Sequence, residues 1–175
     1  MKNPLVIIIT GLQCSGKTTL GKNLSKELKI PFISKDDIKE ILFDDLGWKD
    51  KEWSIKLGSA SYDLLYYITE ELLKVNNSLI IETNFYPKLA KKRLSILKDK
   101  YSFTPFQIKC FADGEVLFDR FKKRSESKLR HPGHIDGGRI EEWKPVLLRG
   151  KIETINIGGE LLEIDTTDFE KINYK

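Results

Sequence analysis

The sequence predicts a three-layer α/β fold, in which helices cover both faces of a parallel sheet. Five short apolar runs rich in β-branched residues recur along the chain, and segments with helical spacing separate them. Each parallel connection needs a crossover, which is usually a helix, so this alternation indicates a parallel sheet. The expected strands span residues 5–10, 31–34, 79–83, 105–111 and 161–165.

Helical periodicity accounts for the segments between the strands. After the first strand, Leu20, Leu24 and Leu28 recur every four residues, which places them on one face of a helix. Residues 53–73 match a period of 3.6 residues, with apolar positions Trp53, Leu57, Ala60, Leu64, Leu65, Ile68, Leu72 and Leu73. We therefore expect two amphipathic helices before the third strand.

Two further helices are expected in the second half of the chain. Pro87 suits the first position of a helix whose buried side includes Leu89, Leu94 and Leu97. Residues 113–123 form the other. Residues 125–138 then break the helical pattern, because they contain the pairs Pro132-Gly133 and Gly137-Gly138 among charged residues. A long polar loop of this kind is a lid over a binding site or a plain connection, and we expect a lid.

Composition restricts the class of protein. The 175 residues, of which 40% are hydrophobic and 32% charged, suit one domain spanning residues 1–175 and exclude a disordered tail. Two cysteines cannot build a disulfide framework, which favours the reducing cytoplasm. No apolar run is long enough for a signal peptide or a membrane span. Residues 88–151 hold 17 Lys and Arg against 8 Asp and Glu, and such a basic stretch usually meets phosphate or is a solvated helical face.

Residues 11–18 match the phosphate-binding pattern G-x-x-x-x-G-K-[ST] in full, between an apolar strand and a helix. In such a loop the backbone amides and the helix dipole face the phosphates, Lys17 reaches the outer phosphates, and the Thr18 hydroxyl ligates Mg²⁺. We therefore expect the loop and the residue after it to bind a nucleoside triphosphate. These residues are Gly11, Leu12, Gln13, Cys14, Ser15, Gly16, Lys17, Thr18 and Thr19.

Carboxylates follow the second strand, at the edge of the sheet where open α/β folds bind ligands. Asp36 there can take the proton of an acceptor hydroxyl and align its oxygen with the γ-phosphate. The competing interpretation is that Ser34 caps a helix with Asp37 in its first turn. Both can hold, with one acid beside the cap and Asp36 in the chemistry.

The third strand also ends in polar residues. Glu82 could hold a metal-bound water or an acceptor hydroxyl, and Asn84 could hydrogen-bond the acceptor. As alternatives, Glu82 is a plain acid at a strand end and Asn84 is a turn residue.

Three arginines lie in or beside the expected lid. Arg120 and Arg124 are four residues apart on one helix face, and Arg130 follows in the loop. Arginines carried by a closing lid would stabilise the charge that accumulates during phosphoryl transfer, so we assign all three a catalytic role.

Two other groups of residues have alternative interpretations. His131, His134 and Asp136 could ligate Zn²⁺, but a fourth ligand is not apparent, and polar contacts from the lid are the favoured interpretation. Trp48, Trp53 and Tyr62 either line the acceptor pocket or pack against the core, and their spacing favours packing.

Four segments occur in the order found in small P-loop kinases. They are the phosphate loop, then Ser34-Lys35-Asp36-Asp37-Ile38, then Leu79-Ile80-Ile81-Glu82-Thr83-Asn84, and last the helix bearing Arg120 and Arg124. The chain most resembles the AAA-domain ATP-dependent kinases, which are related to polynucleotide kinases and chloramphenicol phosphotransferase. The resemblance implies strand order 2-3-1-4-5 and a general-base role for Asp36. It also implies that adenine binds between a lid-side arginine, here Arg120, and the loop near Thr167. Polynucleotide kinases carry Arg where this chain has Lys39, which we assign to acceptor binding.

These observations favour an ATP- and Mg²⁺-dependent kinase that phosphorylates a hydroxyl of a small molecule. One alternative is a kinase that acts on the 5′-hydroxyl of a nucleic acid or nucleotide. Lys39 and the lack of a clear aromatic platform for stacked bases disfavour it. The other alternative is an ATP-binding regulatory protein without catalysis.

Overall fold

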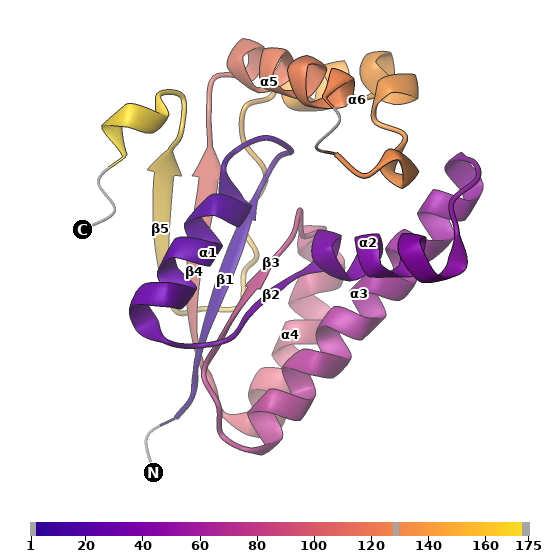
Figure 1. The fold of residues 1–175 in the computed structure, drawn as a ribbon. Coiled ribbons are helices and arrows are strands. Elements are labelled where there is room, and N and C mark those ends of the chain that lie inside the picture. Colours follow the sequence, from indigo (N-terminus) through magenta and orange to yellow (C-terminus); the bar gives the residue numbers. More distant parts are fainter. Residues whose placement is uncertain (1–2, 128–129, 173–175) are drawn as a thin grey trace.

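Five parallel strands form a sheet in the order β2-β3-β1-β4-β5 (Figure 1). The structure, a computed structural model, describes residues 3–127 and 130–172. Its strands are β1 (Leu5–Gly11), β2 (Phe32–Ser34), β3 (Leu79–Glu82), β4 (Thr104–Phe111) and β5 (Glu160–Asp165). Every strand expected from the sequence is present to within one residue at each end, and the order implied by the resemblance is confirmed.

Helices and short 3₁₀ turns connect the strands. The helices are α1 (Lys17–Leu28), α2 (Lys35–Leu46), α3 (Lys51–Lys74), α4 (Pro87–Tyr101), α5 (Gly114–Glu126) and α6 (Ile140–Leu147). The 3₁₀ turns are η1 (Pro132–His134), η2 (Gly137–Arg139) and η3 (Phe169–Lys171). Residues 128 and 129 of the expected lid lie outside the described residues.

Alternation along the central strand β1 divides the core into two layers. Val6 and Ile8 face α3 and α4, whereas Ile7 and Ile9 pack with Leu20 of α1. Figure 1 accordingly shows α1 on one side of the strands and α3 and α4 on the other. This arrangement confirms the three-layer fold.

A third apolar cluster lies at the carboxyl ends of the strands, where α5 and α6 cross above the sheet (Figure 1). Leu117 and Phe121 of α5 and Leu147 of α6 are fully buried there, against Leu12 of the phosphate loop. The loop is thereby fixed from above by α5 and from below by the sheet.

The expected burial of Leu89 is wrong. Leu89 is 67% exposed, because Ala90, Leu94 and Leu97 form the buried stripe of α4 and Leu89 lies about 100° away around the helix. Leu28 is 48% exposed at the last turn of α1, and Leu64 of α3 is also exposed. Helix α6 was not expected at all. Within the described residues, no helix is both long and apolar enough to span a bilayer.

Candidate active site

The phosphate loop leaves β1 through a glycine that no other residue can replace without strain. Gly11 has φ +153°, and a Cβ there would lie 2.3 Å from the Cys110 carbonyl oxygen of the neighbouring strand. Gly16, at φ +77°, is the N-cap of α1. The loop therefore depends on backbone conformations that favour glycine, as its sequence pattern predicted.

Lys17 and Thr18, the first residues of α1, meet Glu82 at the end of β3. Lys17 Nζ donates to the Leu12 carbonyl oxygen at 2.7 Å and lies 3.9 Å from Glu82 Oε1. The Thr18 hydroxyl donates to Glu82 Oε2 at 3.2 Å. Burial raises the pKa of Glu82, while the Lys17 ammonium opposes that shift. The hydroxyl and carboxylate provide oxygen ligands, the kind that Mg²⁺ prefers.

Ser34 joins the ends of β2 and β3 and also caps α2. Its hydroxyl donates to Glu82 Oε2 at 2.9 Å and accepts from the backbone N–H of Asp36 at 3.3 Å. The cap interpretation is therefore confirmed. The cap is compatible with a role for Asp36 in the cleft. Ser34 fixes the first turn of α2, and the Asp36 side chain in that turn lines the cleft.

Asp36 is held between two cations. Its Oδ1 accepts from Lys35 Nζ at 3.2 Å and its Oδ2 accepts from Arg130 Nη2 at 2.9 Å. Partial enclosure by the cleft raises the pKa of Asp36, but Lys35, Arg130 and His134 outweigh this effect and hold the pKa well below its usual range. In this state the carboxylate is ionised and oriented.

Arg130 binds the predicted lid segment, residues 125–138, to α2. Besides Asp36, it donates to Glu40 Oε1 at 3.2 Å and to Asp136 Oδ2 at 3.3 Å. Arg124 Nη2 reaches the same Asp136 oxygen at 3.1 Å. Two of the three arginines assigned to catalysis therefore converge on one carboxylate beside the phosphate loop.

Buried polar atoms near these arginines lack partners. Within the described residues, Arg124 Nε and Gln13 Oε1 are buried without a hydrogen bond. Unpaired buried groups are costly in a folded protein, so an unpaired guanidinium donor beside the loop suits an anionic ligand.

Arg120 lies apart from the other two arginines. Its Nη1 and Nη2 donate to the carbonyl oxygens of Thr166 and Thr167, both at 2.9 Å. Its guanidinium stacks 3.8 Å from the ring centroid of Phe169, and this ring also covers Gly16. The contacts place Arg120 beside the loop after β5, where the resemblance puts adenine, so its contact with the transferred phosphate remains a prediction.

The opposite end of the cleft is formed by α2, α3 and the residues after β3. Lys39 Nζ donates to Ser54 Oγ at 2.9 Å, and Ser54 donates to the Gly133 carbonyl oxygen at 2.9 Å. Asn84 lines the cleft, and its backbone carbonyl oxygen accepts from the Tyr62 hydroxyl at 2.9 Å. Lys39 and Asn84 thus line the cleft beyond Asp36, and their assignment to acceptor binding remains a prediction.

The histidines of the lid bind α2 rather than one another. His131 Nε2 is 3.1 Å from Asp44 Oδ1, and His134 Nε2 is 2.9 Å from Glu40 Oε1. Asp136 binds arginines instead. Within residues 3–127 and 130–172, no three His, Cys, Asp or Glu side chains are grouped as a metal site would require.

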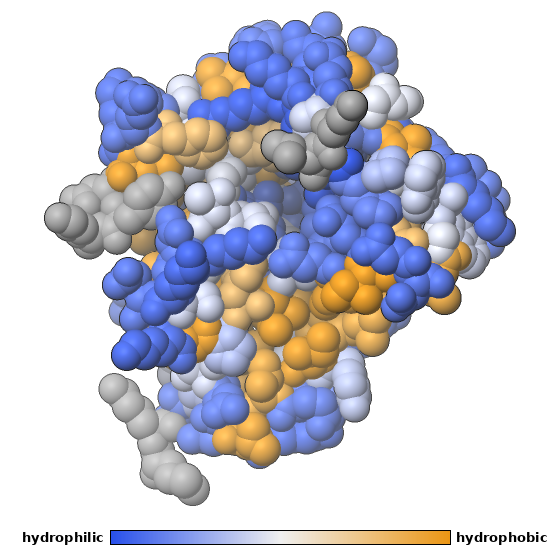
Figure 2. All heavy atoms as spheres, in the orientation of Figure 1, coloured by the Kyte–Doolittle hydropathy of each residue, from blue (hydrophilic) through white to orange (hydrophobic). Residues whose placement is uncertain are grey.

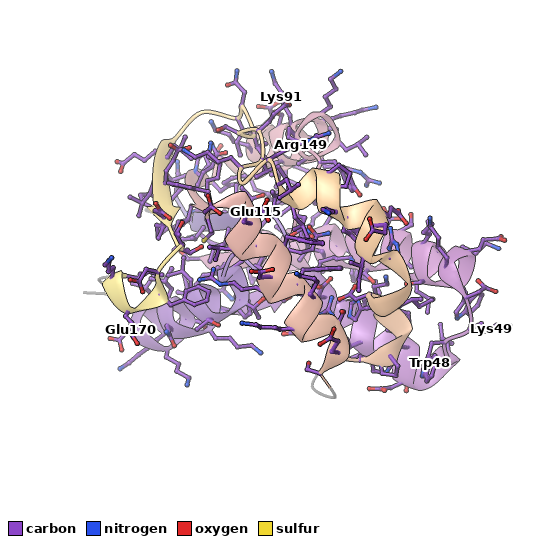
Figure 3. The ribbon with its side chains drawn as sticks, turned by 90° about the horizontal axis from the view of Figure 1, so that it is seen from above. Trp48, Lys49, Lys91, Glu115, Arg149 and Glu170 are labelled. Carbon is purple, nitrogen blue, oxygen red and sulfur yellow. The ribbon has the colours of Figure 1, made fainter. Side chains whose placement is uncertain are left out.

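The aromatic residues left open by the sequence fall in different places. Tyr62 lines the cleft, whereas Trp48 is 50% exposed and Trp53 is half-buried, with its indole N–H on the Gly47 carbonyl oxygen. Seen from above in Figure 3, Trp48 lies at the edge of the molecule, on the side opposite Glu170. The packing prediction is thus wrong for Trp48, and it missed the place of Tyr62 in the cleft.

One cleft of about 1200 Å³ joins the phosphate loop to the region around Asp36, Lys39 and Tyr62. Figure 2 shows it as a hollow bordered mainly by hydrophilic residues. Sequence reasoning missed Phe169, Gly58 and Tyr66 among its lining residues. Phe169 gave no signal because it lies outside any motif, 158 positions from the first glycine of the loop it covers.

Comparison with known proteins agrees with this geometry. A family model described as "AAA domain" matches residues 6–147. The crystal structure of a "putative kinase" from Chloroflexus aurantiacus shares 39% identity, covers 99% of this chain and 94% of its own, and superposes with TM-score 0.89. A search of curated proteins found no match.

More distant structures share the fold alone. A sugar kinase from a Janibacter species is 13% identical with TM-score 0.55, over 94% of this chain and 86% of that one. An APS kinase from Mycobacterium tuberculosis, in complex with AMPPNP and APS, is 13% identical with TM-score 0.58, over 94% and 90% of the two chains.

Proposed function

Since the chain belongs to the AAA domain family, whose P-loop implies ATP binding, we propose that it transfers the γ-phosphate of ATP to a hydroxyl group of a small molecule. The observation that supports this most is the shared cleft. The phosphate loop and Asp36 line the same cavity, so a triphosphate and an acceptor would lie in it together. Its volume exceeds the roughly 300–1,000 Å³ typical of a site for one small ligand.

The residues present fit Mg²⁺ between protein and nucleotide. Thr18 would ligate the ion, and Glu82 would hold one of its waters, as their existing hydrogen bond suggests. When bound, the ion would neutralise charge on the β- and γ-phosphates.

Asp36 orients the acceptor hydroxyl and takes its proton in this proposal. While Arg130 donates to Asp36, the carboxylate is a weak base, because a strongly lowered pKa disfavours protonation. A γ-phosphate that attracted Arg130 would relieve this effect and raise the basicity of Asp36 when the phosphate is in place. Arg124, with its unpaired Nε, would bind the same phosphate.

The test is phosphate transfer from ATP in the presence of Mg²⁺ to a panel of sugars, nucleosides, antibiotics and 5′-hydroxyl oligonucleotides. We expect a small-molecule hydroxyl to accept the phosphate with the parent chain and not with Lys17→Ala, which loses the outer phosphate contact. Transfer to oligonucleotides alone would support the nucleic-acid alternative. Tight ATP binding without any acceptor would support a regulatory protein.

A further inference from the structure

Lys39 is a buried cation without an anionic partner. Its side chain is on α2, one turn after Asp36, and the residue is only 7% exposed. Of the three protons on its ammonium group, the structure gives one to the Ser54 hydroxyl. Its Nζ also lies 5.0 Å from the centroid of the Phe43 ring. A buried charge normally requires a counter-ion, because a neutral hydroxyl and a ring face do not replace all the hydration that the ammonium group loses.

The neighbouring cations differ from Lys39 in this respect. Lys35 and Arg130 bind Asp36, and Arg139 binds both carboxylate oxygens of Glu142. In the described part of the chain, no carboxylate oxygen lies within ion-pair distance of Lys39 Nζ. The charge on Lys39 is therefore not neutralised by an ion pair at this end of the cleft.

Space for a ligand is open beside this ammonium group. Gly58 of α3 faces it, and a Cβ at Gly58 would lie 3.6 Å from Lys39 Nζ. Lys39, Ser54 and Gly58 all line the cleft that contains Asp36. The tyrosines of the same helix, Tyr62 and Tyr66, continue its wall.

We propose that the acceptor carries an anionic group, a carboxylate or a phosphate ester, which binds Lys39 while its hydroxyl faces Asp36. This inference rests on the proposed kinase function and narrows its substrate class. The three-residue spacing places both side chains on one face of α2, so one small molecule can reach both.

The protonation of Lys39 supports the same assignment. Burial, and next the Lys35 charge, lower the pKa of Lys39 to about 8, while Asp36 opposes the shift. Lys39 is therefore protonated below pH 8, and a bound anion would raise its pKa. The charged or titratable groups around it are Lys35 and Asp36 on α2 and Arg130, His134 and Arg139 from the lid side, and α3 contributes the neutral Ser54.

The first test titrates sulfate and acetate, as probes for a phosphate ester and a carboxylate, into the chain saturated with Mg²⁺ and AMPPNP. We expect at least one of them to bind about tenfold or more weakly to Lys39→Met than to the parent, since a hydrogen bond to a charged group is lost. Lys56→Met, on the exposed face of α3, is the matched control and should bind like the parent. Equal affinities in parent and Lys39→Met would overturn the proposal.

A second measurement needs no variant. Sulfate does not titrate between pH 7 and 9.5, so its affinity for the parent chain should fall as the pH rises through about 8. An affinity that stays constant over this range contradicts the proposal.

Matched acceptors then separate this inference from the kinase function. Glycerate and glycerol differ at one carbon, which is a carboxylate in one and a hydroxymethyl group in the other, and ribose 5-phosphate and ribose differ only at the 5-hydroxyl. The position of transfer is therefore assigned, and only hydroxyls present in both members of a pair are compared. We expect kcat/KM to favour an anionic member by about tenfold or more in the parent, and Lys39→Met to lose that preference. Transfer to the neutral members without preference would refute the anionic acceptor while the kinase function stands. Failure of AMPPNP to bind would instead refute the kinase function.

Discussion

The substitution Asp36→Asn tests the assignment of chemistry most specifically. It keeps the size of the side chain and one oxygen that can accept from Arg130 or Lys35, but it removes the negative charge. The neutral amide cannot take a proton from an acceptor hydroxyl. We therefore expect turnover to fall while the fold and the nucleotide site persist.

The contacts of Asp36 indicate how much the rate, the ATP affinity and the stability should change. A general base contributes about 10²–10⁴-fold to rate, or roughly 3–5 kcal/mol of barrier. ATP affinity should be retained or rise, because the Asp36 side chain contacts Lys35 and Arg130 rather than loop residues 11–18, and its neutralisation frees Arg130 for the γ-phosphate. The side chain is 40% exposed, so losing the ion pair should cost at most about 1 kcal/mol of stability.

The assay compares kcat for phosphate transfer, the ATP dissociation constant and the melting temperature of parent and variant. Asp45→Asn is the matched control, since it removes an equal charge from the same helix at an exposed position outside the cleft. The control should retain parental kcat. An Asp36→Asn enzyme with more than about a third of the parental kcat would refute the general-base role.

Other consequences follow from particular contacts. Phe169→Ala should tighten ATP binding about two- to fivefold in an equilibrium titration. The reason is that the Phe169 ring covers the face of Arg120 on which a base would stack, and such a contact is worth about 0.5–1 kcal/mol. Weaker binding would mean that the ring forms a wall of the site. Leu94→Ala should lower the free energy of unfolding by about 2–5 kcal/mol in urea denaturation, since Leu94 is fully buried under the sheet, and a loss below 1 kcal/mol would contradict that packing. Gly11→Ala should abolish ATP binding, measured by calorimetry, because its Cβ would collide with the Cys110 carbonyl oxygen; parental affinity would show that the loop tolerates the change.

The sequence predicted the strands and most helices well, because apolar runs, helical periodicity and turn residues are all visible over short stretches of the chain. The central strands β1 and β3 are nearly continuous apolar runs, as expected for strands buried on both faces, and the phosphate loop has a fixed spacing. Helix α4 begins at Pro87 as expected, yet its periodicity alone did not exclude Leu89 from the buried face. Helix α6 was missed because its eight residues include Pro145, which normally disfavours a helix interior.

The candidate site was only partly predictable, because tertiary packing assembles it. The sequence identified Asp36 and Glu82 from their places after strands, and Lys39 only through the resemblance to polynucleotide kinases. It gave no indication that Arg130 would bind Asp36 across 94 positions, or that Phe169 would cover the loop. Such contacts depend on how the lid and the last turn fold back over the sheet.

The most direct test of the kinase proposal uses ATP labelled with ¹⁸O in the γ-phosphoryl group, together with a protein-free extract of small molecules as acceptors. Mass spectrometry follows the label with the parent chain and with Asp36→Asn. The account predicts that the parent transfers the labelled phosphoryl group to a hydroxyl compound and that Asp36→Asn does not. Label found only in inorganic phosphate, or equal transfer by both proteins, would contradict it.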